Sequence, residues 1–406
     1  MNLVSGNPYW VTNSPILSKY SYMTEDVDCD VLIVGAGITG AICAYYFAKA
    51  GINVVVVDKS LVAYGSTSAS TSLLQYEIDN NLTGLSSMIG LDKAVTAFKL
   101  CRQAVYDISD IISEFKDNCE FKEVDCLLYS NEQNEIATMD AEYNLRKKYG
   151  FDVSYLNGES AKSDFSFPIT CGIYSRNASA QINPYKFSHQ LLNDVVINGS
   201  RIFENTEVVA IESDEQGITA KTSTYKTIKA KKAIITMGYE SIKYILEEIV
   251  TITRTYTIVT EPISDIKSWK NQCLIRDSQE AYYYLRTTQD NRIIIGGEDN
   301  SLTGLPDIGW VLENKANALR NKLITMFPYL EGVKITHKFS GLFGNTNDGL
   351  PYIGEYKPMP NCYFNLGYGA NGILYAIFGA QMLLELYLGT KNPSLELFKF
   401  GRKSCQ

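Results

Sequence analysis

The stretch Asp30-Val31-Leu32-Ile33-Val34-Gly35-Ala36-Gly37-Ile38-Thr39-Gly40 decides the fold of this chain. It begins with a short apolar run that is rich in β-branched residues and lacks alternation, which is typical of a parallel strand covered on both faces. A glycine-rich turn follows and opens a segment with helical periodicity, from about residue 38 to residue 50. A second apolar run, at residues 53–57, ends in Asp58. This order of strand, turn, helix and strand predicts a dinucleotide-binding unit of the α/β class.

Each glycine of the turn has its own task in such a unit. Gly35 permits the tight turn, Gly37 lets the backbone approach a pyrophosphate, and Gly40 lets helix and strand pack closely. The helix N-terminus adds unpaired N–H groups and the positive end of a dipole, while Asp58 can accept hydrogen bonds from ribose hydroxyls. The alternative is a glycine-rich turn without a ligand. The candidate cofactor residues here are Gly35, Ala36, Gly37, Ile38, Thr39, Gly40, Asp58 and Lys59.

A second glycine-rich element, Gly367-Tyr368-Gly369-Ala370-Asn371-Gly372, again leads from a strand into a helix. Its helix N-terminus can stabilise negative charge on the pyrimidine side of a reduced isoalloxazine, whereas a nicotinamide would leave it without a task. This element therefore favours FAD over NAD, although an ordinary strand-to-helix turn stays open as an alternative. Its candidate cofactor residues are Gly369, Ala370, Asn371, Gly372 and Ile373.

Small hydroxyl side chains dominate the segment Gly65-Ser66-Thr67-Ser68-Ala69-Ser70-Thr71-Ser72-Leu73-Leu74-Gln75. Hydroxyls and free N–H groups suit phosphates and a ribityl chain, and the last residues are expected to reach the flavin ring. A flexible polar loop is the alternative. The candidate cofactor residues are Gly65, Ser66, Thr67, Ser70, Thr71, Ser72, Leu74 and Gln75.

Composition narrows the class of protein. The 406 residues suffice for about two to three domains. A net charge of -8 without a basic stripe argues against nucleic acid as a partner. Residues 1–28 contain no secretory signal pattern. The longest apolar stretch, residues 372–389, contains Gln381 and Glu385 and is expected to be a buried helix, not an integral membrane segment.

Cysteine and histidine usage points away from metal chemistry. Nine cysteines are scattered without a CxxC pair, and an odd number in a chain without a secretory signal fits a reducing cytoplasm. Only His189 and His337 are available as histidine ligands or bases, and each is expected to be an ordinary surface or core residue. No metal site is expected.

The periodicity of the rest of the chain predicts two interleaved domains. Helices are expected at 91–115, 133–149, 308–327 and 372–388, a β-meander at 202–235, and further strands at 256–259, 281–285, 292–295 and 362–366. The predicted fold is a doubly wound FAD-binding Rossmann-type α/β domain interleaved with an α+β antiparallel-sheet substrate domain. The first is assigned residues 29–117, 184–244 and 336–395, and the second residues 118–183 and 245–335.

Four separated segments, residues 31–58, 65–75, 233–239 and 340–372, together resemble the D-amino acid oxidase-like superfamily of FAD-dependent oxidoreductases. The last contains Thr346-Asn347-Asp348-Gly349-Leu350-Pro351-Tyr352-Ile353-Gly354, which is similar to the C-terminal signature of that family. The resemblance implies the family fold over nearly the whole chain. It also implies that Val208 lies on the adenine side and that Thr236, Met237 and Gly238 lie near the cofactor.

Within that superfamily, residues 282–288 and 292–299 resemble the glycine oxidase and γ-glutamylputrescine oxidase-type branch. Relatives that oxidise free amino acids often carry an arginine just before the Thr-x-Asp signature, whereas Ser340-Gly341-Leu342-Phe343-Gly344 has none. An α-amino acid substrate is therefore not indicated. Sarcosine oxidase-like relatives attach their flavin through a cysteine that aligns with Gly341, so the resemblance implies non-covalent FAD.

The substrate side is expected on the strand near residue 284. Tyr282, Tyr284 and Arg286 share one face of that strand. If this face looks toward the flavin, Arg286 is a candidate clamp for a distal carboxylate and Tyr284 a wall, the alternative being a solvent-facing arginine. The candidate catalytic residues are Tyr284, Arg286, Phe343, Tyr256 and Tyr368, with Arg254 a weaker candidate.

These expectations lead to one favoured reaction. The chain is expected to oxidise a primary or secondary amine to an imine by hydride transfer to flavin N5, with O₂ or another electron acceptor as the second substrate. A dehydrogenase that passes electrons to a quinone or a protein carrier uses the same chemistry. Two further possibilities are an NAD(P)-dependent dehydrogenase and a flavin-holding subunit that needs a second chain for turnover.

Overall fold

A mixed sheet with five parallel strands carries the predicted dinucleotide-binding unit. The computed structural model describes residues 3–279, 282–301 and 309–402. Its eight-stranded sheet has the order β10-β3-β2-β13-β12-β11, and β20 also pairs with β13 and with β19. The strands are β2 (Val27–Val34), β3 (Val54–Val57), β10 (Arg201–Phe203), β11 (Val208–Asp214), β12 (Gly217–Thr222), β13 (Thr227–Ile235), β19 (Tyr352–Tyr356) and β20 (Met359–Leu366). Strands β10, β3, β2, β13 and β20 run parallel, so the order expected from the glycine motif is confirmed.

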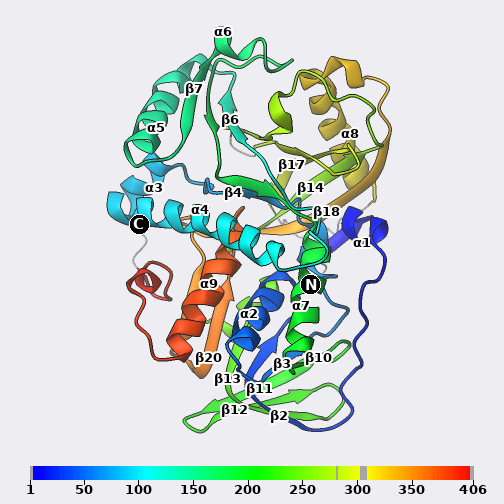
Figure 1. The fold of residues 1–406 in the computed structure, drawn as a ribbon, viewed down its shortest axis with the longest axis vertical. Coiled ribbons are helices and arrows are strands. Elements are labelled where there is room, and N and C mark those ends of the chain that lie inside the picture. The colour runs from blue at the N-terminus through cyan, green and yellow to red at the C-terminus, as the bar shows by residue number, and fades with distance from the viewer. Residues whose placement is uncertain (1–2, 280–281, 302–308, 403–406) are drawn as a thin grey trace.

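Three helices cover one face of this sheet. They are α2 (Ile38–Lys49), α7 (Pro184–Ile197) and α9 (Gly372–Tyr387), and α2 packs against both of the others. Figure 1 shows them side by side in front of the strands. The opposite face carries a second hydrophobic cluster. It includes Leu32 and Val34 of β2 and Ile218 of β12, together with residues of β11 and of the segment after β13. Burial on both faces explains why β3 consists of four valines, all fully buried.

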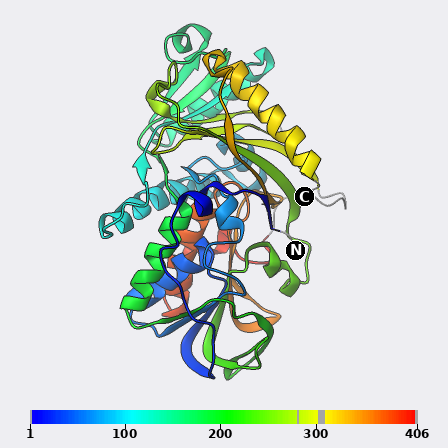
Figure 2. The ribbon, with the colours of Figure 1, turned by 90° about the vertical axis from the view of Figure 1, so that its right-hand side faces the viewer.

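The second sheet has nine strands in the order β1-β18-β14-β17-β16-β15-β6-β8-β7. They are β1 (Val4–Gly6), β6 (Cys126–Ser130), β7 (Val153–Asn157), β8 (Cys171–Ser175), β14 (Thr251–Thr260), β15 (Leu274–Asp277), β16 (Tyr284–Thr287), β17 (Ile293–Ser301) and β18 (Ile335–Asn345). Every neighbouring pair is antiparallel except β15 with β6. Helix α8 (Gly309–Met326) packs on β14 and β17, and α5 (Ile136–Lys148) packs on β7 and β8. Figure 2 shows α8 along the outer side of the sheet.

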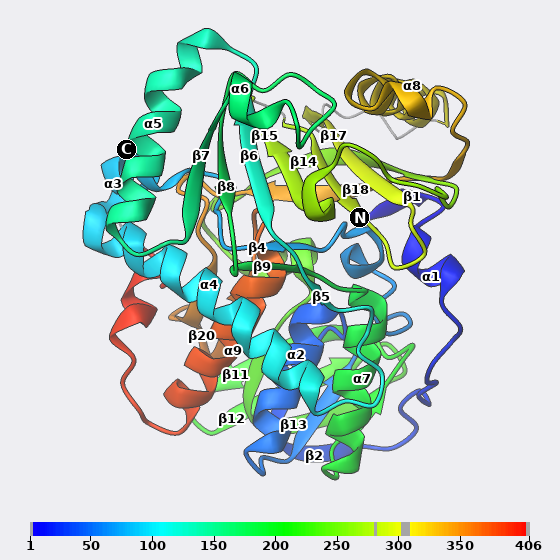
Figure 3. The same cartoon turned by 45° about the horizontal axis from the view of Figure 1, so that its top comes forward.

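The two sheets form two layers joined by segments that cross between them. The long helix α4 (Leu91–Ser113) packs on α9 and runs across the front of the molecule in Figure 3, between the upper sheet and the helices of the lower one. Next to it lies a small sheet in the order β4-β9-β5, made of β4 (Leu73–Gln75), β9 (Ser179–Gln181) and β5 (Lys122–Glu123). The interleaved α/β architecture predicted from the sequence is therefore confirmed.

Two details differ from the sequence expectations. Strand β18 belongs to the nine-stranded sheet, although residues 336–345 were assigned to the FAD-binding domain, and the N-terminal strand β1 extends the same sheet with Val4 opposite Gly341. The expected starts at residues 281 and 308 lie outside the described residues. Within the described ranges, no helix has both the length and the apolar character needed to cross a membrane.

A buried group of charges ties the crossing segment after β4 to the upper layer. Arg146 of α5 makes ion pairs with Glu77 and with Glu142, the latter at 2.6 Å, and the three side chains are at most 1% exposed. Glu142 also accepts hydrogen bonds from the backbone N–H groups of Leu82 and Thr83, both at 2.8 Å. Burial alone would raise the pKa of Glu142, but Arg146 and these two donors lower it. The segment 77–83 is thus fixed between the two layers.

Replacing Arg146 with methionine should destabilise the protein by about 3–5 kcal/mol, because two buried carboxylates lose their counter-ion. A lower thermal midpoint in circular dichroism would show it. Lys162→Met is the matched control, since its ion pair with Glu159 is exposed, and it should change stability by less than about 1 kcal/mol. Equal midpoints for Arg146→Met and the wild type would contradict this role of the buried charges.

Candidate functional site

A cavity of about 500 Å³ lies where the two layers meet, and both glycine-rich turns line it. The ends of β2, β3, β13 and β20 contribute from the parallel sheet, and β1, β14, β15, β16 and β18 contribute from the nine-stranded sheet. Residues 64–75 line it between them. Segments more than 300 residues apart in the sequence therefore face one common space.

The first glycine-rich turn has almost no room for side chains except at one position. Gly35 has a φ of +110°, and a Cβ there would lie 2.6 Å from the carbonyl oxygen of Thr236. A Cβ on Gly40 would lie 1.8 Å from the carbonyl oxygen of Gly35. A Cβ on Gly37 would meet only the hydroxyl of Thr67, at 3.1 Å. Backbone contact therefore requires glycine at 35 and 40, whereas Gly37 keeps the N-terminus of α2 open toward the cavity.

Asp58 links the second strand to this turn. Its Oδ2 accepts a hydrogen bond from the N–H of Ala36 at 2.7 Å, and its Oδ1 accepts one from Ser60 at 2.8 Å. Burial raises the pKa of Asp58, although both backbone donors oppose the rise. Each carboxylate oxygen has a further lone pair, so two backbone bonds leave acceptor capacity for a ribose hydroxyl. Asp58 lines the cavity, as does Lys59, which pairs with Glu240 at 2.6 Å.

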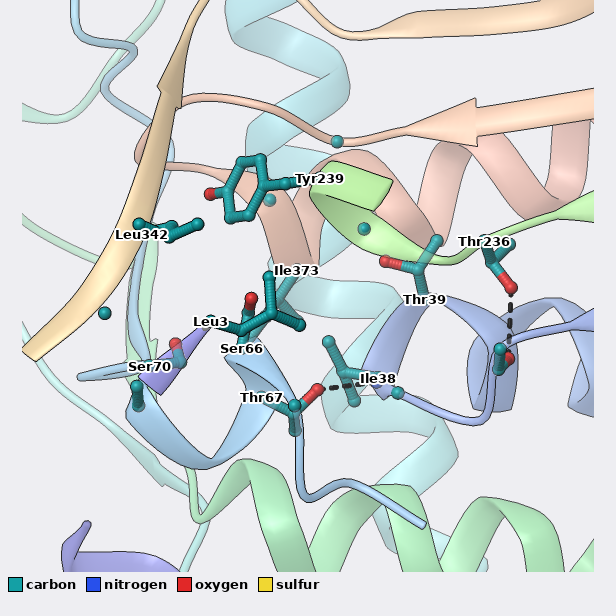
Figure 4. A pocket seen from close by; sticks show the side chains of 18 of the residues that line it. Leu3, Ile38, Thr39, Ser66, Thr67, Ser70, Thr236, Tyr239, Leu342 and Ile373 are labelled. Atoms are coloured by element: carbon teal, nitrogen blue, oxygen red, sulfur yellow. Dashed lines mark hydrogen bonds between the residues drawn. The ribbon is translucent and has the colours of Figure 1, made fainter. Parts of the chain in front are cut away.

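The hydroxyl-rich segment closes over the turn as a short 3₁₀ helix, η1 (Ser66–Ala69). Thr67 Oγ1 accepts a hydrogen bond from the N–H of Ile38 at 2.9 Å. Figure 4 shows this bond and shows Ser66, Leu3, Ile38 and Ile373 gathered around the same space. Segment 65–75 is therefore held against the N-terminus of α2, and is not a loose polar loop.

Several buried polar atoms on the cavity wall have no hydrogen-bond partner within the protein. Among the described residues these include Ser66 Oγ, Ser72 Oγ and Asn371 Oδ1. A buried polar group without a partner is costly, so such atoms in a lined cavity are expected to bond a ligand. Together with the open N-terminus of α2, they fit a molecule with phosphates, hydroxyls and a heteroaromatic ring, as FAD has.

The second glycine-rich turn is equally tight. A Cβ on Gly367 would lie 2.8 Å from the carbonyl oxygen of Gly372, and Gly369 has a φ of +90°. Asn371 directly precedes α9 as its N-cap residue, and its side chain donates a hydrogen bond to the carbonyl oxygen of Gln75 at 3.0 Å. Asp79 accepts a hydrogen bond from the N–H of Ala370 at 3.0 Å. The turn is therefore fixed to the segment that follows β4.

Aromatic and apolar side chains line the middle of the cavity. Tyr239 stacks on Tyr368 with ring centroids 5.5 Å apart, and Gly344 leaves room for Tyr239, because a Cβ there would lie 2.6 Å from its ring. Burial raises the pKa of Tyr239 to about 12. Leu342 and Phe343 of β18 line the same region, and Figure 4 shows Leu342 beside Tyr239. These groups provide a dry wall suited to a flat ring system.

Two tyrosines line the cavity from the side of the nine-stranded sheet, Tyr284 in β16 and Tyr282 just before that strand. Tyr282 donates a hydrogen bond to Asp79 at 2.7 Å, and the hydroxyl of Tyr284 lies 3.0 Å from that of Thr255. Tyr284 lies over Gly296 of the neighbouring strand, where a Cβ would be 2.3 Å from the ring. Burial raises the pKa of both tyrosines, so both remain protonated at neutral pH.

The structure brings most of the sequence-predicted residues to this cavity, but not all of them. The candidates that do not line it are Ala36, Gly40, Arg254, Tyr256 and Arg286. Gly40 and Ala36 act within the turn, through the close contact and the hydrogen bond described above. Tyr256 packs on the opposite face of its sheet, with the core beneath α8.

Arg286 occupies a place that does not suit a substrate clamp. It is fully buried, and its Nη1 donates to the carbonyl oxygens of Thr71, Ser72 and Ile182 at 2.9–3.1 Å. Its guanidinium also lies 5.3 Å from the ring of Trp10. Burial lowers the pKa of Arg286 to about 9, which leaves it charged at neutral pH. It shares a strand face with Tyr284, as expected, but the N-terminal segment and residues 71–72 cover it.

Some residues that shape the cavity did not emerge from the sequence. Arg276 of β15 lines the cavity beside Tyr284, its partner across the strands, and Tyr239 and Leu342 line it as well. Asp79 does not line the cavity, but it bridges Tyr282 and Ala370, which do. The available signal for Arg276 was a charged residue that directly follows the apolar pair Leu274-Ile275. Neither histidine lines the cavity, and within the described ranges no group of three His, Cys, Asp or Glu side chains is arranged to hold a metal ion.

Comparisons with known proteins agree with this geometry. The family model described as FAD dependent oxidoreductase (DAO) matches residues 30–386. The chain is 23% identical to gamma-glutamylputrescine oxidoreductase of Escherichia coli K12 over 390 residues, which cover 94% of this chain and 88% of that protein. It is 26% identical to glycine oxidase of Bacillus licheniformis over 391 residues, covering 93% and 98% of the two chains.

The fold is also found among solved structures. Glycine oxidase from Geobacillus kaustophilus superposes with a TM-score of 0.80 at 19% identity, covering 93% of this chain and 99% of that one. The fold class and the family resemblance inferred from the sequence are both confirmed.

Replacing Gly37 with valine should abolish retention of FAD, because the added side chain would project from the one open position of the turn into the cavity. The ratio of flavin absorbance to protein absorbance after gel filtration measures this. Gly332→Val is a matched control, since a Cβ at Gly332 meets no atom within 4 Å, and it should retain FAD. A Gly37→Val protein with the wild-type flavin content would contradict the assigned phosphate position.

Proposed function

The chain belongs to the DAO family of FAD dependent oxidoreductases, and on this basis we propose that it oxidises the C–N bond of a primary or secondary amine to an imine. Bound FAD supplies the hydride acceptor, at N5 of its ring. The observation that carries the proposal is the single cavity lined by both glycine-rich turns and by the tyrosine face of the nine-stranded sheet.

The residues in the cavity suit a reaction that needs orientation and desolvation more than acid–base groups. In our proposal, the turn at Gly37 and the hydroxyls near Ser66 hold the dinucleotide, and the turn at Gly369 faces the pyrimidine edge of the ring. Tyr284 and Phe343 then form walls of the substrate space. A buried aromatic wall disfavours an ammonium ion, so it lowers the pKa of a bound amine toward neutrality and favours the reactive neutral form.

Non-covalent attachment of FAD is part of the proposal. None of the described lining residues is a cysteine. Gly341 carries no side chain, and a Cβ there would already lie 3.0 Å from Ala69. These features support a flavin held by shape and hydrogen bonds alone.

The names of the relatives support amines and amino acid derivatives as the substrate class. A protein named glycine oxidase and one named gamma-glutamylputrescine oxidoreductase both match this chain over more than 90% of its length. The electron acceptor is proposed to be O₂, with a quinone or a protein carrier as the competing possibility. Oxygen consumption during turnover separates the two.

Anaerobic mixing of the FAD-loaded protein with a panel of amines should bleach the flavin absorbance with at least one of them. A stopped-flow spectrometer records the rate, and the imine formed should hydrolyse to a carbonyl compound. A panel of primary, secondary and amino acid-derived amines that leaves the flavin fully oxidised, while dithionite reduces it, would contradict amine oxidation.

Gly296→Ala should slow flavin reduction by about 10²-fold without loss of FAD, because the added methyl group forces the ring of Tyr284 to shift in the substrate space. Stopped-flow reduction with the best amine of the panel measures the effect. Gly332→Ala is the matched control and should react like the wild type. A Gly296→Ala rate within twofold of the wild type would remove Tyr284 from the substrate wall.

A further inference from the structure

Three arginines with almost no exposed surface differ sharply in how their donors are satisfied. The exposed fraction is 0% for Arg146, 0% for Arg286 and 4% for Arg276. Arg146 pairs with two buried carboxylates, and Arg286 donates to several carbonyl oxygens. Both are therefore structural cations with partners inside the protein.

Arg276 has much weaker partners. Its Nε is buried without a hydrogen-bond partner, and its Nη1 lies 3.5 Å from the carbonyl oxygen of Ile78, at the limit of a hydrogen bond. Its distance to the nearest carboxylate oxygen of Asp79 is 3.9 Å. A guanidinium carries five N–H donors, so this buried cation is left with most of its bonding capacity unused.

Asp79 is the nearest carboxylate, but at 3.9 Å it is too far from Arg276 for a hydrogen bond, because two other donors orient it. Its Oδ1 accepts from Tyr282 at 2.7 Å and its Oδ2 accepts from Ala370 at 3.0 Å. Tyr282 in turn places its ring 5.3 Å from the guanidinium of Arg276, which fixes the plane of the guanidinium. Asp79 thus holds the neighbours of Arg276 in position and leaves the guanidinium edge available.

The position of Arg276 indicates the kind of ligand that its guanidinium would bind. Among the described lining residues that come from the nine-stranded sheet, Arg276 alone carries a charge. It lies beside Tyr284, the proposed substrate wall. A buried, under-bonded guanidinium in a cavity is suited to a planar anion that accepts two parallel hydrogen bonds, which is the geometry of a carboxylate.

We propose that Arg276 binds a carboxylate of the substrate, so that the enzyme selects amines that carry a carboxylate group. This inference rests on the proposed amine oxidation. The proposal assigns recognition of the carboxylate to β15. Strand β18 offers no arginine in the segment Ser340–Gly344. Arg286 of β16 is not suited to this role because it donates its hydrogen bonds to carbonyl oxygens of the protein.

Binding of simple carboxylates tests this role without turnover. Acetate and benzoate, compared with acetamide and benzamide, are titrated into FAD-loaded protein at constant ionic strength, and the change in the flavin spectrum gives each Kd. The wild type should bind each carboxylate at least tenfold more tightly than its amide. Arg276→Gln should weaken the binding of both carboxylates by about 10- to 100-fold and leave the amides unchanged, and Arg276→Lys should fall between.

Two controls keep the result specific. Arg176→Gln removes the same charge from an exposed ion pair with Asp152 and should leave every Kd unchanged. Flavin content and the thermal midpoint of each variant show that the fold is intact. The comparison of carboxylate with amide in the wild type needs no variant, so it holds even if Arg276→Gln does not fold.

Three outcomes would overturn the proposal. The first is that the wild type binds a carboxylate and its amide with equal affinity. The second is that the Kd for benzoate in Arg276→Gln lies within twofold of the wild-type value. The third is that Arg276→Gln shifts the midpoint potential of the flavin but leaves carboxylate binding unchanged, which would place the guanidinium against the flavin. Fast reduction by amines without a carboxylate would also overturn it while leaving amine oxidation intact. Failure of every amine to reduce a protein that still binds carboxylates through Arg276 would contradict the proposed function alone.

Discussion

The close contact between the turn at residues 35–40 and the end of β13 is the constraint on which the rest of the structure depends. The carbonyl oxygen of Thr236 would lie 2.6 Å from a side chain at Gly35, so strand, turn and helix meet without side chains between them. This contact aims the N-terminus of α2 at the space above the sheet. The hydroxyl of Thr67 then caps Ile38 and fixes η1 beside it. FAD binding by this family follows from that arrangement.

The second requirement is that the nine-stranded sheet stays in place over that space. Asp79 connects Tyr282 of the upper layer with Ala370 of the lower layer, and the charges around Arg146 fix the segment that carries Asp79. The N-terminal segment adds β1 to the same sheet and donates from Trp10 to the carbonyl oxygen of Ser70 at 2.6 Å. The substrate space is therefore shaped by buried polar contacts between distant parts of the chain.

Local patterns predicted much of this fold. The strand, turn and helix at 30–50 and the four strands expected at 202–235 lie within a few residues of their expected bounds, because burial on two faces and turn-forming residues are visible in the sequence. Only β11, β12 and β13 form the meander, since β10 instead pairs parallel with β3. Substrate-side residues were harder to place. Tyr256 was a candidate for the pocket, but its neighbour Thr255 lines the cavity while Tyr256 lies on the opposite face of β14, in the core beneath α8. Alternation shows that the two side chains point to opposite faces, but it does not show which face looks toward the cavity. The cover over Arg286 and the bridge from Asp79 to Tyr282 depend on contacts across about 200 residues, which no local pattern encodes.

The most direct test of this account is a crystal structure of the protein purified with its flavin. We expect the pyrophosphate of FAD at the N–H groups near Gly37, and the ring between Tyr239, Leu342 and the turn at residues 367–372. A flavin bound elsewhere, or a cavity whose two glycine-rich turns contact different ligands, would contradict it.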